Sequence, residues 1–185
     1  MRTLIVSEFV TLDGVMEAPG GEAGHPHSGW VFPFMGEEQM SYKLAETLAA
    51  ESLLLGRATY EGFLEAWPSR DGEFADKMNA MPKHVASTTL QEPAWNATVL
   101  GGDVPGAVAA LKATEGGPIL VAGSCTLVHT LLLAGLVDEL RLMVFPVSIG
   151  DGKRVFPEEQ SKQSWRRTER IDFSTGVTVS HYAPA

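Results

Sequence analysis

The stretch Pro118–Ala122, PILVA, is apolar at every position and restricts the fold of this chain more than any other feature. A strand with one face in water alternates polar and apolar residues, whereas a strand covered on both faces is apolar throughout. The run Leu53–Leu55 and the β-branched stretch Thr3–Val10 repeat the covered pattern. Strands of this kind are typical of parallel sheets that carry helices on both faces.

Helical segments separate these strands. In Glu37–Ala50, for example, Met40, Leu44 and Leu48 recur on one face of a helix. The strands that we expect are Thr3–Val10, Ser52–Leu55, Lys83–Ser87, Ala97–Leu100, Pro118–Ala122 and Leu140–Val147. The helices that we expect are Glu37–Ala50, Thr59–Trp67, Asp71–Asn79, Val104–Thr114 and Ser124–Ala134.

The end of the chain follows a different pattern. Ser164–Phe173 and Val177–His181 alternate, and Ser-Thr-Gly separates them, which predicts an antiparallel hairpin. The fold class is therefore α/β, a mostly parallel central sheet flanked by helices with a C-terminal antiparallel hairpin. Because no repeat, low-complexity segment or linker interrupts this order, we expect residues 1–185 to form a single domain.

Charge and cysteine content restrict the partners. The formal net charge is −9, which disfavours a nucleic-acid duplex or an anionic membrane as partner. Cys125 is the single cysteine, so a disulfide framework is excluded and no metal site is predicted. No apolar stretch reaches the roughly 20 residues of a membrane span. We expect a cytoplasmic protein that binds a small molecule.

The first candidate binding motif follows the strand Ser52–Leu55 and reads Gly56-Arg57-Ala58-Thr59. Glycine lets a ligand approach the backbone closely, and the helix N-terminus that follows attracts anions. The Arg57 guanidinium can bind a phosphate through two parallel hydrogen bonds. A capped helix with a surface arginine explains the same residues equally well, with Thr59 as the cap.

Two further strand ends carry similar residues. The strand Pro118–Ala122 runs into Gly123, Ser124, Cys125 and Thr126 at the start of a helix, where Ser124 is either a helix cap or a phosphate ligand. The strand Lys83–Ser87 ends in Ser87 and Thr88, whose hydroxyls belong either to a turn or to a nucleotide site. Parallel strands place their carboxyl ends at one edge, so three such ends together predict a trough for an extended phosphorylated ligand.

The order of these motifs resembles the dihydrofolate reductase-like family. The resemblance is strongest to the reductase domain of the bifunctional riboflavin-biosynthesis deaminase-reductase and its stand-alone relatives, and it covers nearly the whole chain. The residues that carry it are Thr11-Leu12-Asp13-Gly14, Leu55-Gly56-Arg57-Ala58-Thr59-Tyr60, Pro82-Lys83 with Ser87-Thr88, Ala122-Gly123-Ser124, Leu136-Val137-Asp138-Glu139-Leu140, Pro146, Gly150-Asp151-Gly152 and Phe156-Pro157.

The resemblance implies an NADPH-dependent oxidoreductase that transfers a hydride to a small substrate. Carried over, Arg57 and Thr59 hold the 2′-phosphate and the pyrophosphate, beside Gly56 and Ala58. Ser87 and Thr88 lie near the adenosine. The pyrophosphate lies on the turn after Ala122, formed by Gly123, Ser124, Cys125 and Thr126. The turn Leu12, Asp13, Gly14 and Val15 lies beside the nicotinamide. Independently of the resemblance, Asp13 is a candidate to orient the nicotinamide or to relay a proton, and an Asp-Gly turn explains this residue equally well.

The substrate side departs from the family. Dihydrofolate reductase binds its pterin through a helix carboxylate, and Met40 falls near that position here. The 14–36 loop contains His25 and His27 but no Lys or Arg for the ribose phosphate of the riboflavin-pathway substrate, 5-amino-6-(5-phosphoribosylamino)uracil. Two alternatives therefore stay open: a non-catalytic nucleotide-binding protein that kept the fold, and a homodimer whose partner chain completes the substrate pocket.

Overall fold

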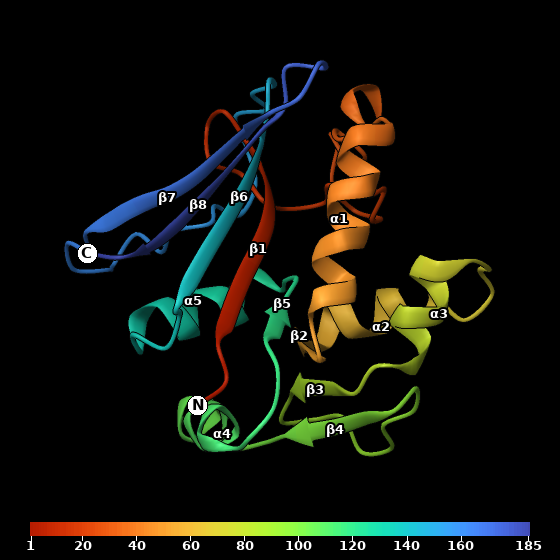
Figure 1. The fold of residues 1–185 in the computed structure, drawn as a ribbon, viewed down its shortest axis with the longest axis vertical. Helices are drawn as coiled ribbons and strands as arrows, with labels where there is room; N and C mark the ends of the chain where they lie inside the picture. Colours follow the sequence, from red (N-terminus) through yellow and green to blue (C-terminus); the bar gives the residue numbers. More distant parts are fainter.

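Strand β1 (Leu4–Thr11) lies inside an eight-stranded sheet in the order β4-β3-β2-β5-β1-β6-β8-β7 (Figure 1). The computed structural model describes residues 1–185. The other strands are β2 (Ser52–Gly56), β3 (Lys83–Ala86), β4 (Ala97–Leu100), β5 (Ile119–Val121), β6 (Glu139–Phe145), β7 (Trp165–Asp172) and β8 (Thr178–Pro184). The helices are α1 (Glu37–Ala49), α2 (Arg57–Ala66), α3 (Glu73–Ala80), α4 (Val104–Ala113) and α5 (Cys125–Leu133), with a 3₁₀ turn at Phe32–Phe34.

The strand pairing confirms the predicted fold class. Strands β4, β3, β2, β5, β1 and β6 are parallel, with β1 in register from Leu4 to Val6 with β5 and from Ile5 to Thr11 with β6. Strands β6 and β8, and β8 and β7, are antiparallel, so the tail is a hairpin on one edge of the sheet. Each predicted helix and strand is present, with ends that differ by a few residues.

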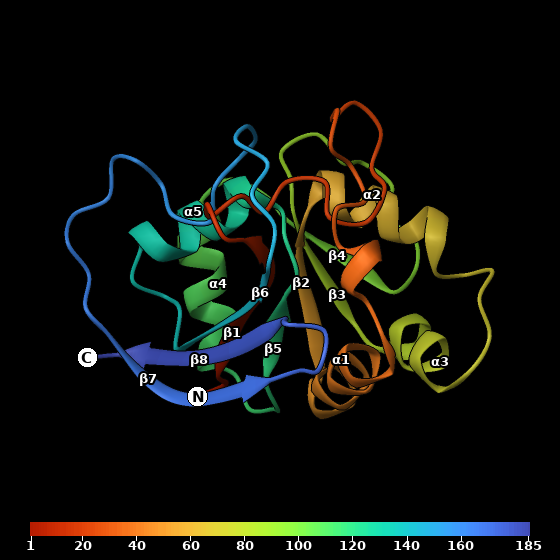
Figure 2. The same ribbon diagram turned by 90° about the horizontal axis from the view of Figure 1, so that it is seen from above.

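Helices cover both faces of the sheet, as expected for strands that are apolar throughout (Figure 2). Helices α4 and α5 pack on one face, where Val108 and Leu131 join a core with Leu4 and Leu54 of the strands. Helices α1, α2 and α3 lie on the other face, where Tyr60 packs among strand residues. A third apolar cluster lies under the 14–36 loop. Burial of these strands on both faces explains why their sequences lack polar alternation.

Helix α1 buries polar side chains. The apolar stripe of Met40, Leu44 and Leu48 in its sequence is not its most buried side. Met40 and Leu48 are exposed, whereas Gln39 and Glu46 are buried. Glu46 accepts hydrogen bonds from Ser7 Oγ at 2.9 Å and from Arg141 Nη1 at 3.2 Å, and it also pairs with Lys43. Burial alone would raise the pKa of Glu46, but these partners outweigh it and hold the pKa below its usual value.

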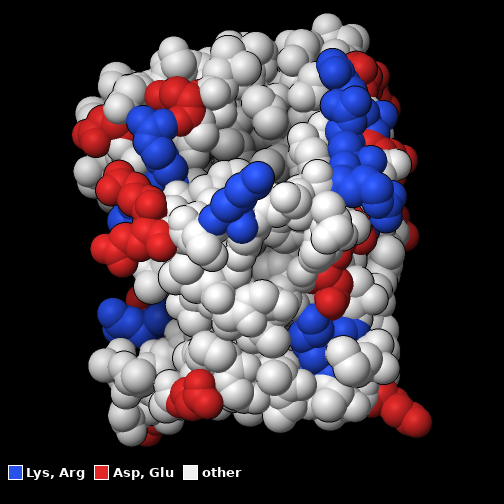
Figure 3. Space-filling view, turned by 90° about the vertical axis from the view of Figure 1, so that its left-hand side faces the viewer, with Lys and Arg blue, Asp and Glu red and all other residues white.

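Strand β7 is the exposed edge of the hairpin and is rich in charge. Arg166, Arg167, Glu169 and Arg170 are all exposed, and the β7–β8 register shifts between Arg167 and Glu169. Charged side chains and a bulge discourage an edge strand from pairing with another chain. On this side of the molecule, acidic and basic groups lie mainly along both margins, and basic atoms also lie near the middle (Figure 3).

The packing of β2 gives a stability prediction. Leu54 is fully buried in the core between the sheet and α5, so Leu54→Ala leaves a cavity and should lower the free energy of unfolding by about 3 kcal/mol. Leu133 of α5 is 56% exposed and is the matched control, because Leu133→Ala leaves no cavity. Urea unfolding of both variants measures the difference. Equal losses would contradict the placement of β2 in the core.

Candidate functional site

One cleft of about 670 Å³ lies along the carboxyl ends of β2, β3, β4 and β5. Seven of the residues predicted to bind a nucleotide line it. They are Gly56, Arg57, Ala58, Ser87, Thr88, Ser124 and Thr126. The structure therefore brings the three strand-end motifs together into one elongated hollow.

A fourth strand end, that of β4, completes the cleft and was not predicted from the sequence. It contributes Gly102, Asp103, Val104 and Pro105. Four other lining residues were also not predicted, and they lie at the end of β3 and in α5: Ala86, Thr89, Leu127 and Thr130. The sequence signal for this strand end is Gly101-Gly102-Asp103, which lies between the strand Ala97–Leu100 and the helix that follows. It has glycine and a polar residue before a helix, as the other strand ends do. Asp103 caps α4 by accepting a hydrogen bond from Gly106 N at 3.1 Å, so part of its hydrogen-bonding capacity serves the fold.

Close packing of two strand-to-helix turns explains the glycines. A Cβ on Gly56 would lie 2.1 Å from Ser124 Oγ, and Gly56 N donates to Gly123 O at 3.3 Å. Gly123 has a φ of +80°, and a Cβ there would lie 2.9 Å from Thr59 Oγ1. Each glycine thus leaves room for a side chain of the other turn, Ser124 against Gly56 and Thr59 against Gly123. Backbone amides at both turns are left close to the cleft.

The two helices that begin at these turns lack side-chain caps. Neither Gly56 before α2 nor Ser124 before α5 caps its helix through a side chain. The capping alternative for Ser124 therefore does not hold. Uncapped helix N-termini carry unpaired N–H groups and a partial positive charge, which favour an anion. The structure places two of them at one cleft.

Arg57 and Asp103 are the charged residues among those lining the cleft. The Arg57 side chain is half exposed, and its Nη1 lies 3.4 Å from Glu61 Oε1 one turn along α2. Such exposed pairs contribute little stability and are easily exchanged. The Arg57 guanidinium is therefore free to pair with a stronger anion. Ser87 serves the turn, since its Oγ accepts from Thr89 N and Leu90 N, whereas Thr88 is exposed at the cleft.

The predicted residues after β1 lie apart from the lining of this cleft. Leu12 is exposed, and Val15 is fully buried beneath the turn. Asp13 accepts hydrogen bonds from Thr11 Oγ1 at 2.6 Å and from Gly150 N at 2.8 Å. The Thr11 hydrogen bond is the largest cause of a lowered pKa for Asp13. The Asp13 side chain thus ties the turn after β1 to the Gly150 loop. A lowered pKa favours the carboxylate, which accepts protons and does not donate them.

Five more predicted residues do not line the cleft. Gly14 lies in the turn after β1, and the others lie in or beside the β2–α2 and β5–α5 turns: Thr59, Ala122, Gly123 and Cys125. Gly14 has a φ of +86° and its carbonyl accepts from Val155 N, so its glycine serves a turn. Cys125 Sγ lies 3.3 Å from both the Arg154 carbonyl and His129 Nε2. Burial raises the pKa of this thiol, which disfavours the reactive thiolate.

Glu8 was missed from the sequence because it stands alone within an apolar strand. Its side chain is 8% exposed, and its Oε1 accepts a hydrogen bond from Gly123 N at 2.7 Å. Burial is the largest cause of a pKa raised to about 8, so the carboxyl is mostly protonated at neutral pH. A neutral carboxyl thus lies beside the β5–α5 turn.

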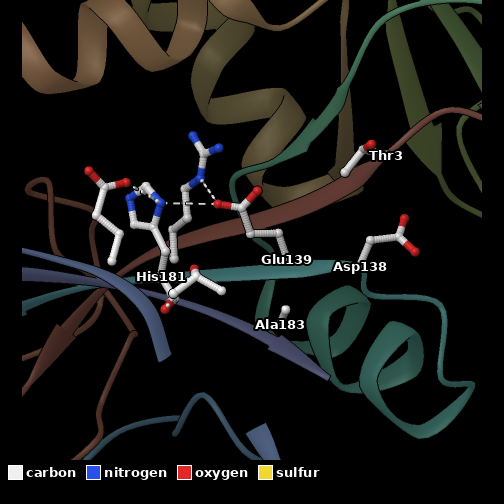
Figure 4. A pocket seen from close by; sticks show the side chains of 8 residues that line it. Thr3, Asp138, Glu139, His181 and Ala183 are labelled. Atoms are coloured by element: carbon white, nitrogen blue, oxygen red, sulfur yellow. Dashed lines mark hydrogen bonds and ion pairs between the residues drawn. The ribbon is translucent and has the colours of Figure 1, made fainter. Parts of the chain in front are cut away.

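A second hollow lies at the opposite, amino ends of β1 and β6, near Thr3 and Asp138. Figure 4 shows His181 and Glu139 pointing toward each other inside it. His181 Nδ1 lies 3.1 Å from Glu139 Oε1, and Arg141 Nε donates to the same oxygen at 2.8 Å. These side chains pair with one another, and Arg141 also donates to Glu46 of α1. The hollow is therefore the solvent-facing side of the polar network that joins α1 to the sheet. Ligands of open α/β sheets bind at the other edge.

No group of three or more His, Cys, Asp or Glu side chains is arranged to hold a metal ion. None of the helices has both the length and the apolar character of a membrane span.

Residues 2–179 match the family model of the RibD C-terminal domain. Among curated proteins, the uncharacterized YyaP of Bacillus subtilis is 27% identical over 188 residues, which cover 98% of this chain and 94% of that protein.

Two solved structures share the fold. A Shewanella protein provisionally named a riboflavin biosynthesis protein has a TM-score of 0.78 and 21% identity, with 99% of each chain covered. Dihydrofolate reductase of Enterococcus faecalis, solved with NADP(H) and RAB-propyl, has a TM-score of 0.65 and 17% identity, with 98% of this chain and 96% of that chain covered. The dihydrofolate reductase-like fold that the motifs predicted is confirmed.

The contact between the two turns gives a second prediction. Gly56→Ala places a methyl group against Ser124 and should lower the free energy of unfolding by about 2 kcal/mol, because the turns must separate. Adding Ser124→Gly removes the atoms that clash and should recover much of the loss in thermal unfolding. If Gly56→Ala were as stable as the parent chain, the turns would not pack as closely as described.

Proposed function

This chain belongs to the RibD C-terminal domain family, and we propose that it is an NADPH-dependent reductase that transfers a hydride to a small substrate. The observation that carries the proposal is the single cleft in which Gly56, Arg57, Thr88, Ser124 and Thr126 meet. A hollow of this length, with two uncapped helix N-termini and one arginine, suits an extended molecule with phosphates at separate points.

The shape of the turns fits a dinucleotide. Gly56 N and Gly123 N already donate to Gly123 O and Glu8 Oε1, so the N–H groups left for a phosphate are those of the first turns of α2 and α5. In this proposal Ser124 and Thr126, at the first turn of α5, hold the pyrophosphate. Arg57 holds the 2′-phosphate, and Thr88 borders the adenosine. NADPH, when bound, supplies the hydride.

The 14–36 loop covers the β1 end of the sheet and is well anchored. Trp30 Nε1 donates to Glu17 O at 2.8 Å, and the indole packs edge-on against Phe145 with ring centroids 5.4 Å apart. In this proposal the loop excludes water from the hydride-transfer region. Because it contains no Lys or Arg, it favours a small planar, carbonyl or imine substrate over a phosphorylated one.

The cofactor preference gives a third prediction. Arg57→Ala should weaken NADPH binding by tenfold or more, on the order of one lost charged hydrogen bond, and should leave NADH binding almost unchanged. NADH lacks the 2′-phosphate that Arg57 is proposed to hold. Quenching of tryptophan fluorescence during titration measures both dissociation constants.

Arg166→Ala on the edge strand β7 is the matched control, since Arg166 is also exposed and lies outside the cleft. It should change neither constant. Equal weakening of NADPH and NADH by Arg57→Ala would contradict the role of Arg57. Failure of the parent chain to bind either nucleotide would contradict the proposed function. Tight binding without reduction of any pterin, pyrimidine riboside or simple carbonyl would instead favour a non-catalytic nucleotide-binding protein.

A further inference from the structure

The crevice between β1 and β5 is the topological switch point of the sheet. From β1 the chain crosses by α1 to β2 on one face, whereas from β5 it crosses by α5 to β6 on the other face (Figure 2). The two connections thus leave neighbouring strands toward opposite faces of the sheet. In open α/β sheets this crevice is where ligands bind.

Glu8 occupies that crevice. The β1–β5 pairing runs from Leu4 and Ile119 to Val6 and Val121 and then stops. Two residues further along each strand, Glu8 Oε1 accepts from Gly123 N at 2.7 Å, so a side chain replaces the missing backbone partner. The carboxyl therefore stands where the two strands separate, next to the turn proposed to hold the pyrophosphate.

Three titratable groups face Glu8 from two helices, and none of them pairs with it. Lys43 and Glu46 face it from α1 and act in opposite senses, while Cys125 faces it from α5. Lys43 Nζ already bonds Ser7 Oγ and Glu46. Glu8 thus has one backbone hydrogen bond and no counter-ion, which is why burial raises its pKa to about 8.

We propose that Glu8 distinguishes the oxidised from the reduced cofactor, its carboxyl losing a proton when the cationic nicotinamide ring binds in the β1–β5 crevice. The inference rests on the proposed cofactor site. The reduced ring is neutral and gives the carboxyl no reason to ionise. The oxidised ring carries a positive charge, which favours a carboxylate beside it and releases the proton to solvent.

The sign of the pH dependence follows from linkage. In the free protein the carboxyl is protonated below about pH 8. The bound cation lowers the pKa of Glu8, so binding of the oxidised cofactor releases a proton and strengthens as the pH rises toward 8. Above that pH, Glu8 is already ionised and the affinity levels off. Titration of the 2′-phosphate affects both redox forms alike and cancels in the ratio of their dissociation constants.

The test measures the dissociation constants of NADP⁺ and NADPH between about pH 6 and pH 9 by fluorescence and calorimetry. The ratio of the NADP⁺ constant to the NADPH constant should fall by up to about tenfold per pH unit and level off near pH 8. Near pH 7, calorimetry in buffers of different ionisation enthalpy should count up to one proton released with NADP⁺ and none with NADPH.

Two variants isolate the carboxyl. In Glu8→Gln the amide oxygen can still accept from Gly123 N, so the turn is kept while the titrating proton is lost. The ratio should then be independent of pH and no proton should be released. Glu169→Gln, on exposed β7, should behave like the parent chain.

The outcomes separate this inference from the proposed function. If both nucleotides bind and the parent ratio does not change with pH, the role of Glu8 is wrong and the cofactor site stands. The same conclusion follows if Glu8→Gln keeps the pH dependence of the parent. If neither nucleotide binds, the proposed function fails and the role of Glu8 fails with it.

Discussion

The direct contact between the β2–α2 turn and the β5–α5 turn is the constraint on which the rest of the site depends. Gly56 and Ser124 meet where even a methyl group would clash, and Gly56 N donates to Gly123 O across the junction. This contact brings the starts of α2 and α5 to one place. The cleft, its uncapped amides and the position of Arg57 all follow from it.

Two buried carboxyls show how the same sheet creates opposite protonation states. Glu46, on the buried side of α1, has Lys43, Ser7 and Arg141 as partners, and its pKa is lowered despite burial. Glu8, in β1, accepts a hydrogen bond only from Gly123 N, and its pKa is raised to about 8. The charged cluster fixes α1 to the sheet, whereas the neutral carboxyl stands at the crevice where charge can change. The division between structural and functional carboxyls therefore follows from the number of partners.

Much of the fold and of the cleft could be predicted from the sequence, because both depend on local patterns. Apolar runs such as Pro118–Ala122 identify buried parallel strands, and parallel strands place Gly56 and Ser124 at one edge. The role of Glu8 could not be predicted, since its partner, Gly123, is distant in sequence. The buried side of α1 could not be predicted for the same reason, since Ser7 and Arg141, which hydrogen-bond to Glu46, lie on β1 and β6. The apolar stripe at Met40 and Leu48 faces outward instead.

The measurement that tests the central claim most directly is backbone hydrogen exchange of the intact chain with and without NADPH. A nucleotide held by the strand ends protects the amides with which it bonds. NADPH should slow exchange at residues 56–59 and 123–127 and leave the β7–β8 hairpin unchanged. Unaltered exchange at both turns under saturating NADPH, or protection confined to another surface, would contradict the account.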